Sequence, residues 1–89
     1  MKYILITVRK IFILEIITES CETKEEAVKK MKAALLVRIK MDGSEKEAEK
    51  EMELLEDGLE FSNAILKESE AYIYQDCGEV FHHWKIVEI

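Results

Sequence analysis

The segment from Tyr3 to Thr18 is the feature that most constrains the fold. Its sequence, YILITVRKIFILEIIT, is apolar except at Thr7, Arg9, Lys10, Glu15 and Thr18. Side chains that are branched at Cβ or aromatic predominate, and they favour a strand because they fit a pleated surface better than a helix. Alternate residues of a strand point to opposite faces, and both faces here are mainly apolar. We therefore expect a strand that is covered on both sides.

This segment is too long to run straight through the domain. At about 3.3 Å per residue it extends roughly 50 Å, whereas a compact domain of this size is only about 30 Å across. It must bend or fold back near Arg9 and Lys10, or project onto a second subunit. Arg-Lys lacks the Gly, Asn or Asp of a two-residue hairpin turn. We therefore predict a strongly bent or bulged strand, with a hairpin as the alternative.

Two capping patterns predict two helices. A Thr-x-x-Glu pattern begins at Thr23 and a Ser-x-x-Glu pattern begins at Ser44. In such a capping box the hydroxyl and the carboxylate bind free amides of the first helical turn. Apolar residues then recur at helical spacing, which predicts amphipathic helices over residues 24–40 and 45–57.

The pattern beyond the second helix is ambiguous. Gly58 costs about 1 kcal/mol inside a helix, so it either ends the second helix or kinks it. We expect a further helical stretch over residues 59–68. The alternation of Leu59 and Phe61 also fits the start of a strand.

Residues 71–89 are typical of a β-hairpin that turns at Asp76–Glu79. A turn centred there sets four cross-strand pairs: Tyr74 with Phe81, Tyr72 with His83, Ile73 with His82, and Ala71 with Trp84. One surface then carries Tyr72, Tyr74, Phe81 and Val87, and the other carries Ile73, Val80, Trp84 and Ile86. Both faces of this hairpin are again largely apolar.

These elements predict an α+β fold in a single domain of residues 1–89. The order is β-α-α-β-β, with a three- or four-stranded antiparallel sheet and two amphipathic helices packed on one face. Nothing remains in the sequence to cover the other face. An exposed apolar sheet face of several hundred Å² is unusual for a monomer. We therefore expect that face to be a homodimer interface or a partner site.

Composition narrows the functional classes. Arg9 and Lys10 would each cost roughly 2.5 to 3.5 kcal/mol in a bilayer, which argues against a membrane span, and no small-residue cleavage site follows the apolar run. We expect a cytoplasmic protein whose two cysteines, Cys21 and Cys77, are reduced. We predict no membrane partner and no cofactor.

His82 and His83, with Cys77 and Asp76, are the only cluster in the sequence with the residue types of a metal site. Adjacent strand residues point to opposite faces, so the two histidines are weak candidates as ligands of one ion, and we predict no metal. Cys77 has no identifiable oxyanion hole or orienting group, as a nucleophile would need. We expect a non-enzymatic protein.

The charge is unevenly distributed. Residues 1–43 hold nine Lys/Arg against six Asp/Glu, and residues 44–89 hold four against thirteen. Within the acidic half, five glutamates recur at helical spacing in a row about 22 Å long: Glu45, Glu49, Glu53, Glu56 and Glu60. Their separation of roughly 6 Å is comparable with that of nucleic-acid phosphates. The row is either a solvated helix face or a site for a basic partner protein.

Direct binding to nucleic acid is disfavoured, because the net charge is −6 and no recognition motif is present. The hairpin aromatics Tyr72, Tyr74, Phe81 and Trp84 are candidates for a dimer face or for stacking against a planar ligand. Aromatic packing within the hairpin is the simpler interpretation.

Lys2-Tyr3 with Ile6 and Val8, followed by Glu19-Ser20 and Thr23-Lys24-Glu25-Glu26-Ala27, resembles the opening of the small DpnD/PcfM-like proteins of phages and plasmids. In those proteins an extended β segment leads into a helix that begins with Glu-Glu-Ala. The resemblance covers about a third of the chain, and the second helix and C-terminal hairpin depart from it. It implies a mobile-element origin and a non-enzymatic role.

Taken together, these patterns predict a small homodimeric protein-binding module. A more specific version of this prediction is an acidic inhibitor, encoded by a mobile element, that mimics nucleic acid and thereby binds a basic host protein. The alternative is a protein that binds a small ligand or a metal ion through the C-terminal hairpin, using Tyr72, Tyr74, His82, His83 and Trp84.

Overall fold

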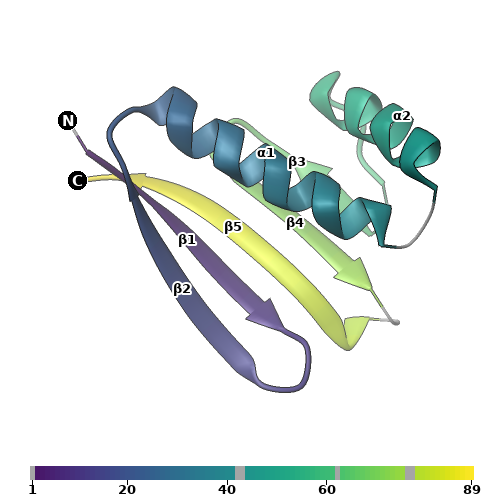
Figure 1. Cartoon of the computed structure of the whole chain (residues 1–89), viewed down its shortest axis with the longest axis horizontal. Helices are drawn as coiled ribbons and strands as arrows, with labels where there is room; N and C mark the ends of the chain where they lie inside the picture. The colour runs from purple at the N-terminus through teal and green to yellow at the C-terminus, as the bar shows by residue number, and fades with distance from the viewer. Residues whose placement is uncertain (1, 42–43, 62, 76–77) are drawn as a thin grey trace.

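The computed structural model describes residues 2–41, 44–61, 63–75 and 78–89, and shows one antiparallel sheet with two helices on one face (Figure 1). Along the chain the elements are β1 (Tyr3–Lys10), β2 (Leu14–Cys21), α1 (Lys24–Lys40), α2 (Glu45–Glu56), β3 (Ala64–Leu66), β4 (Glu70–Gln75) and β5 (Val80–Glu88). The spatial strand order is β2-β1-β5-β4-β3. The α+β class is confirmed, with five strands instead of three or four and the order β-β-α-α-β-β-β.

The N-terminal segment is a hairpin, so the preferred prediction of one bent strand was wrong and the hairpin alternative was correct. β1 and β2 pair in register from Tyr3 opposite Cys21 to Lys10 opposite Leu14. The chain therefore reverses over residues 11–13, a three-residue loop that does not require the dipeptide chemistry of a two-residue turn. Folding back also explains how the segment from Tyr3 to Thr18 fits into a domain of this size, because each strand has only eight residues.

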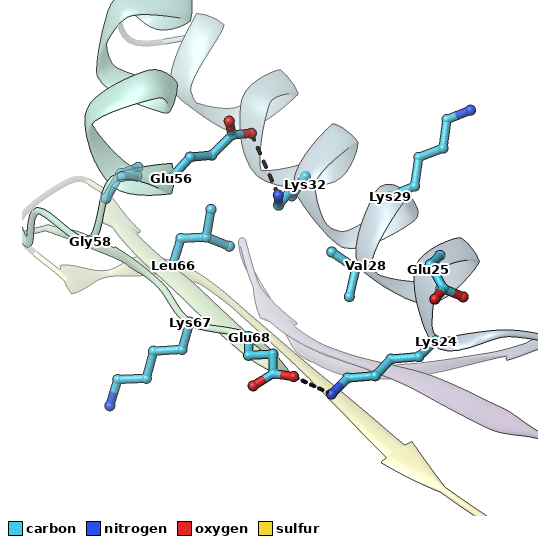
Figure 2. Close-up of a pocket in the computed structure, with 11 residues that line it drawn as sticks. Lys24, Glu25, Val28, Lys29, Lys32, Glu56, Gly58, Leu66, Lys67 and Glu68 are labelled. Atoms are coloured by element: carbon cyan, nitrogen blue, oxygen red, sulfur yellow. Dashed lines mark hydrogen bonds and ion pairs between the residues drawn. The ribbon is translucent and has the colours of Figure 1, made fainter.

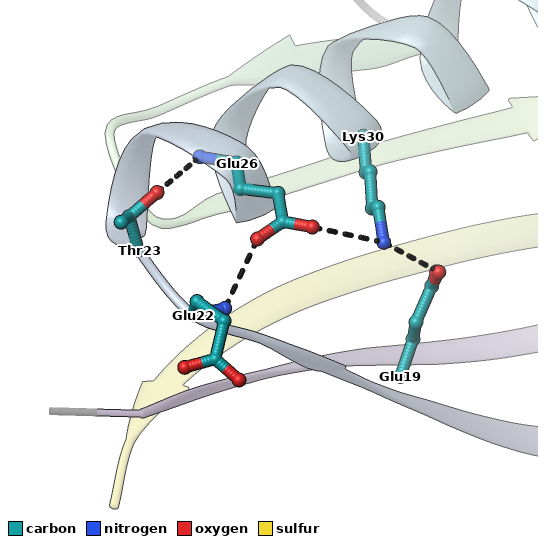
Figure 3. Close-up of polar contacts among 5 residues, drawn as sticks. All are labelled: Glu19, Glu22, Thr23, Glu26 and Lys30. Carbon is teal, nitrogen blue, oxygen red and sulfur yellow. Dashed lines mark hydrogen bonds and ion pairs between the residues drawn. The ribbon is translucent and has the colours of Figure 1, made fainter.

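Both predicted helices are confirmed, and their caps explain where they begin. The Thr23 hydroxyl accepts a hydrogen bond from the Glu26 amide at 3.1 Å, and the Glu26 carboxylate accepts one from the Glu22 amide at 3.0 Å (Figure 3). The Ser44 hydroxyl likewise accepts from the Glu47 amide at 3.2 Å. Each cap satisfies amides that have no partner within the helix.

The expected helical stretch over residues 59–68 was wrong. Gly58 has a φ of +89°, its amide donates to the Leu55 carbonyl, and the Leu59 amide donates to the Leu54 carbonyl. These two bonds form a Schellman motif, which ends α2 and redirects the chain. The chain then forms the short strand β3 at Ala64–Leu66, which pairs with β4. A strand does occur in this segment, but it does not start at Leu59 and Phe61 as the alternative had it, because neither residue is in a strand.

The C-terminal hairpin is confirmed together with its predicted register. Tyr74 lies opposite Phe81, Tyr72 opposite His83, Ile73 opposite His82, and Ala71 opposite Trp84. Asp76 and Cys77, at the centre of the predicted turn, lie outside the described residues.

The hydrophobic core occupies the space between the helices and the sheet. Leu5, Ile73, Trp84 and Ile86 come from the strands. Ala27, Met31, Leu35 and Ile39 come from α1, and Ala48, Met52 and Leu55 come from α2. Burial of one of the leucine, isoleucine or methionine side chains stabilises the fold by roughly 1.5 to 3 kcal/mol. The molecule measures 37 × 31 × 19 Å and is therefore a thin two-layer structure.

Among the described residues, no helix combines the length and the apolar character needed to cross a membrane. The expected cytoplasmic location stays a prediction.

Candidate binding surfaces

The face of the sheet that points away from the helices, here called the open face, is mostly apolar. Directly opposed residues share a face, so the pairing of Val8 with Ile16 and His83, and of Ile6 with Thr18 and Lys85, identifies which side chains lie there. Its apolar and aromatic members are Ile4, Ile6, Val8, Leu14, Ile16, Ile65, Tyr72, Tyr74, Phe81, His83 and Val87. Figure 1 shows both helices on the other side of the sheet.

Three of the four predicted hairpin aromatics form one cluster on the open face. Tyr72 and Tyr74 have ring centroids 5.2 Å apart, and Tyr74 and Phe81 have centroids 6.1 Å apart. His83 lies among them, with its Nε2 atom 2.8 Å from the Tyr74 hydroxyl oxygen. Trp84 does not share this surface, because it is the next residue along the strand and points into the core, where it is 2% exposed.

His82 also lies on the helix side, where it stacks on Trp84 with ring centroids 5.7 Å apart. It is 4% exposed, and no described residue forms a hydrogen bond with its Nδ1 atom. Burial lowers the pKa of His82 to about 4, and the positive charges of Arg38 and Arg9 add to this effect. The imidazole is therefore neutral at physiological pH.

The two histidines cannot serve one metal ion, because they lie on opposite faces of the sheet. No group of three or more His, Cys, Asp or Glu side chains in the described ranges is arranged to hold a metal. Cys77, the third weak candidate, lies outside those ranges.

The acidic row is only partly assembled. Glu45 pairs with Lys40 at 3.4 Å and Glu56 pairs with Lys32 at 3.7 Å, so α1 neutralises both ends of the row. Glu60 follows the end of α2 and does not continue the row on the helix. Glu49 and Glu53 remain as its exposed centre. A basic partner for this row stays a prediction.

A groove that the sequence did not predict lies between α1, the end of α2 and the connection from β3 to β4 (Figure 2). Its volume is about 640 Å³, and its apolar lining includes Val28, Leu55 and Leu66. Two ion pairs cross it, Lys24 with Glu68 at 2.7 Å and Lys32 with Glu56 at 3.7 Å. The groove was missed because one of its walls depends on β3, where we expected helix.

A second unpredicted surface is the distal part of the N-terminal hairpin. Six apolar residues there are at least 40% exposed, and we call them the apolar arm: Ile11, Phe12, Ile13, Leu14, Ile16 and Ile17. Phe12 at the tip is 93% exposed. Figure 1 shows this end of the hairpin extending beyond the helices. The only signal in the sequence was the apolar segment over residues 3–18, which is more than the two predicted helices can cover.

Comparisons with protein-family models, with curated proteins and with solved structures each find no match to this chain. The resemblance to DpnD/PcfM-like proteins therefore stays a prediction.

Proposed function

We propose that this chain is a non-enzymatic protein-binding module that works as a homodimer and holds its partner on the open face of the sheet. The observation that carries the proposal is that an aliphatic and aromatic sheet face has no cover from either helix of the described residues (Figure 1). Its side chains on β1, β4 and β5 are partly exposed, and Leu14 and Ile16 on β2 are exposed. Contiguous apolar patches larger than a few hundred Å² on a protein surface mark interaction sites.

The chemistry of the open face supports a protein partner. Tyrosine and phenylalanine are enriched in protein interfaces because they provide a large contact area with little loss of side-chain entropy. The ring contacts and the hydrogen bond between Tyr74 and His83 hold these side chains in place before binding. Such preorganisation reduces the entropy that is lost on association.

Variants of Ile6 and Val37 test this proposal. Ile6 lies on the open face, and Val37 is a 58% exposed residue of α1 on the opposite side. Proteins retained from lysate of the encoding organism are compared for wild type, Ile6→Lys and the control Val37→Lys, which is on the other side of the sheet and more exposed than the partly buried Ile6. We expect one retained protein to be lost with Ile6→Lys and kept with Val37→Lys. Equal retention by all three chains contradicts the proposal, provided that circular dichroism shows the same fold.

The finer proposal, mimicry of nucleic acid toward a basic host protein, depends on the exposed glutamates of α2. Reversing Glu49 and Glu53 to lysine replaces the part of the row that α1 does not neutralise. If the retained partner is basic and binds this row, the double variant loses it and added salt weakens wild-type binding. If the double variant binds as wild type does, the acidic row has no role.

The groove between the helices favours a second candidate function, the binding of a small amphipathic molecule. Its volume lies within the roughly 300 to 1,000 Å³ typical of ligand sites, and apolar side chains lie between the lysines at its ends. A thermal-shift screen with medium-chain fatty acids tests it, because a ligand that binds the native state raises the Tm. Val28→Trp should fill the groove and abolish the shift, whereas Val37→Trp should not. If no acid raises the wild-type Tm, this candidate fails.

A further inference from the structure

We propose that two copies of this chain join through β2, pairing antiparallel with Ile16 of one copy opposite Ile16 of the other, to give a continuous ten-stranded sheet. This inference rests on the homodimer in the proposed function and specifies how it is built. It assigns the second copy to the edge of the sheet and leaves the open face for the partner.

The first observation is that β2 is an unprotected edge strand. It pairs with β1 along all eight of its residues and is the outermost strand of the sheet. Natural proteins guard such edges with charged side chains, above all lysine, with proline, with bulges or with very short strands. The sequence of β2, LEIITESC, has neither lysine nor proline, its only charged residues are Glu15 and Glu19, and its register with β1 runs without interruption. Its outer backbone groups are therefore available to another strand.

The second observation is the area of the apolar arm. The exposed fractions are 93% for Phe12, 69% for Ile13, 67% for Ile16, 61% for Leu14, 43% for Ile11 and 40% for Ile17. These fractions amount to an exposed area on the order of 700 Å², close to the roughly 800 Å² per partner of a stable interface. Leu14 and Ile16 lie on the open side and Ile17 lies on the helix side, so a strand added to β2 would contact apolar residues on both faces.

The third observation is that the charges on β2 are balanced within the subunit. The Glu15 carboxylate lies 3.1 Å from the Arg9 guanidinium. The Glu19 carboxylate lies 2.7 Å from the Lys30 ammonium group, as Figure 3 shows. Neither carboxylate requires a cation from a partner, and the repulsion between two copies of β2 is reduced. Because its glutamates are already paired with cations of the same subunit, β2 can lie beside the β2 of a second copy.

The register follows from symmetry and charge. In an antiparallel pair related by a two-fold axis, one residue faces its own copy, and opposed residues share a face. With Glu15 at the axis the two Glu15 side chains oppose each other, and with Ile17 at the axis Glu15 opposes Glu19. Like charges directly opposite each other are destabilising. With Ile16 at the axis, Leu14 opposes Thr18 and Glu15 opposes Ile17, so apolar contact is gained without opposed charges.

The size of the protein in solution tests the interface. Light scattering is recorded over a wide range of concentrations for wild type, Ile16→Lys and Val37→Lys. Ile16 and Val37 have similar exposed fractions, 67% and 58%, so neither substitution disturbs the core. We expect wild type and Val37→Lys to have twice the mass of one chain, and Ile16→Lys to have half that value.

Cysteine cross-linking tests the register. In a Cys77→Ser background, oxidation should link Ile16→Cys to its own copy, because opposed Cα atoms lie about 4.5 to 5.5 Å apart in such a pair. Ile17→Cys should not link, since it opposes Glu15 of the second copy. Linking of Ile17→Cys in preference to Ile16→Cys overturns the proposed register.

The other outcomes separate this inference from the proposed function. A dimer that survives Ile16→Lys but dissociates with Ile6→Lys packs face to face, so the edge inference fails while the homodimer stands. A wild-type monomer at every concentration removes both the edge contact and the homodimer. Loss of the retained partner from Ile16→Lys with the dimer intact shows that β2 pairs with a strand of another protein, which also overturns the inference.

Discussion

The two edge strands of the sheet, β3 and β2, differ in how far the rest of the chain covers them. β3, at one edge, has only three residues, and its Ala64 and Ile65 are 0% and 7% exposed. The neighbouring helix α2 packs beside it and contributes Leu55, which is 0% exposed, to the same core. β2, at the other edge, has eight residues, most of them exposed, and neither of the two described helices lies over the distal half of its hairpin (Figure 1).

The difference between β3 and β2 shows that the helices of one chain bury only one of the two edges of the sheet. In this chain of 89 residues the helices cover most of one face and one edge of the sheet that the structure describes. Gly58 directs this cover by ending α2 and turning the chain into β3. Folding stability should therefore depend on the covered side, and association should depend on β2.

Leu35→Ala should have the largest effect on folding. Leu35 is 0% exposed beneath α1, and truncation of such a side chain costs about 2 to 5 kcal/mol because a cavity remains. Ile16→Ala, on the bare edge, should lower the free energy of unfolding of the monomer by less than about 0.5 kcal/mol, as surface substitutions do. Urea denaturation of both variants, at concentrations where the protein is monomeric, measures the two values. If the two variants lose similar amounts of unfolding free energy, the side under the helices and the β2 edge do not differ in their contribution to folding.

The buried histidine His82 allows a pH test of the side of the sheet that the helices cover. The pKa of His82 is lowered to about 4, so the unfolded chain takes up a proton below pH 6.5 that the folded chain does not. Stability should fall by about 2 to 3 kcal/mol as the pH decreases from about 6.5 to about 4, at 1.36 kcal/mol per pH unit. Denaturation at a series of pH values measures the loss, and His82→Leu should flatten the curve. An NMR titration that places the His82 pKa near 6.5 would contradict this account.

Local signals predicted part of the fold correctly. The hydroxyl caps at Thr23 and Ser44 mark the start of both helices, because capping satisfies amides within a few residues of sequence. The Asp76–Glu79 turn predicted the register of the C-terminal hairpin, since a turn sets every pair that follows it. From that register the separation of Tyr74 from Trp84 onto opposite faces also followed.

The errors concern features that depend on distant residues. The hairpin of β1 and β2 has no recognisable turn dipeptide, and it is defined by the pairing of β1 with both β2 and β5. β3 has three residues and forms only because β4 lies beside it. The groove and the ion pairs of α2 with α1 depend on the packing of separate elements, which periodicity within one segment does not encode.

Gly58→Ala should have an intermediate effect. The residue has a φ of +89°, and a Cβ added there would meet no atom within 4 Å. The cost is therefore conformational, about 1 kcal/mol, with no steric clash. Gly58→Asn should cost less, since asparagine tolerates positive φ better than alanine. Thermal unfolding measures both variants, and a loss that is equal for the two would show that the backbone conformation is not the cause.

Lys30→Met should have the smallest effect on folding and should act instead on the bare edge. Lys30 pairs with Glu19 at 2.7 Å, and both side chains are partly exposed, so the urea midpoint of the monomer should change little. In the paired register, Glu19 lies about 8 Å from Glu15 of the second copy, a separation within the screening length of about 10 Å at 0.1 M salt. Without Lys30, the dimer should dissociate more readily at low salt and recover as salt is added. Lys24→Met removes a similar pair with Glu68, which is not a residue of β2, and should leave dissociation unchanged. If both variants dissociate alike in sedimentation experiments, local charge balance at β2 is not what permits the contact.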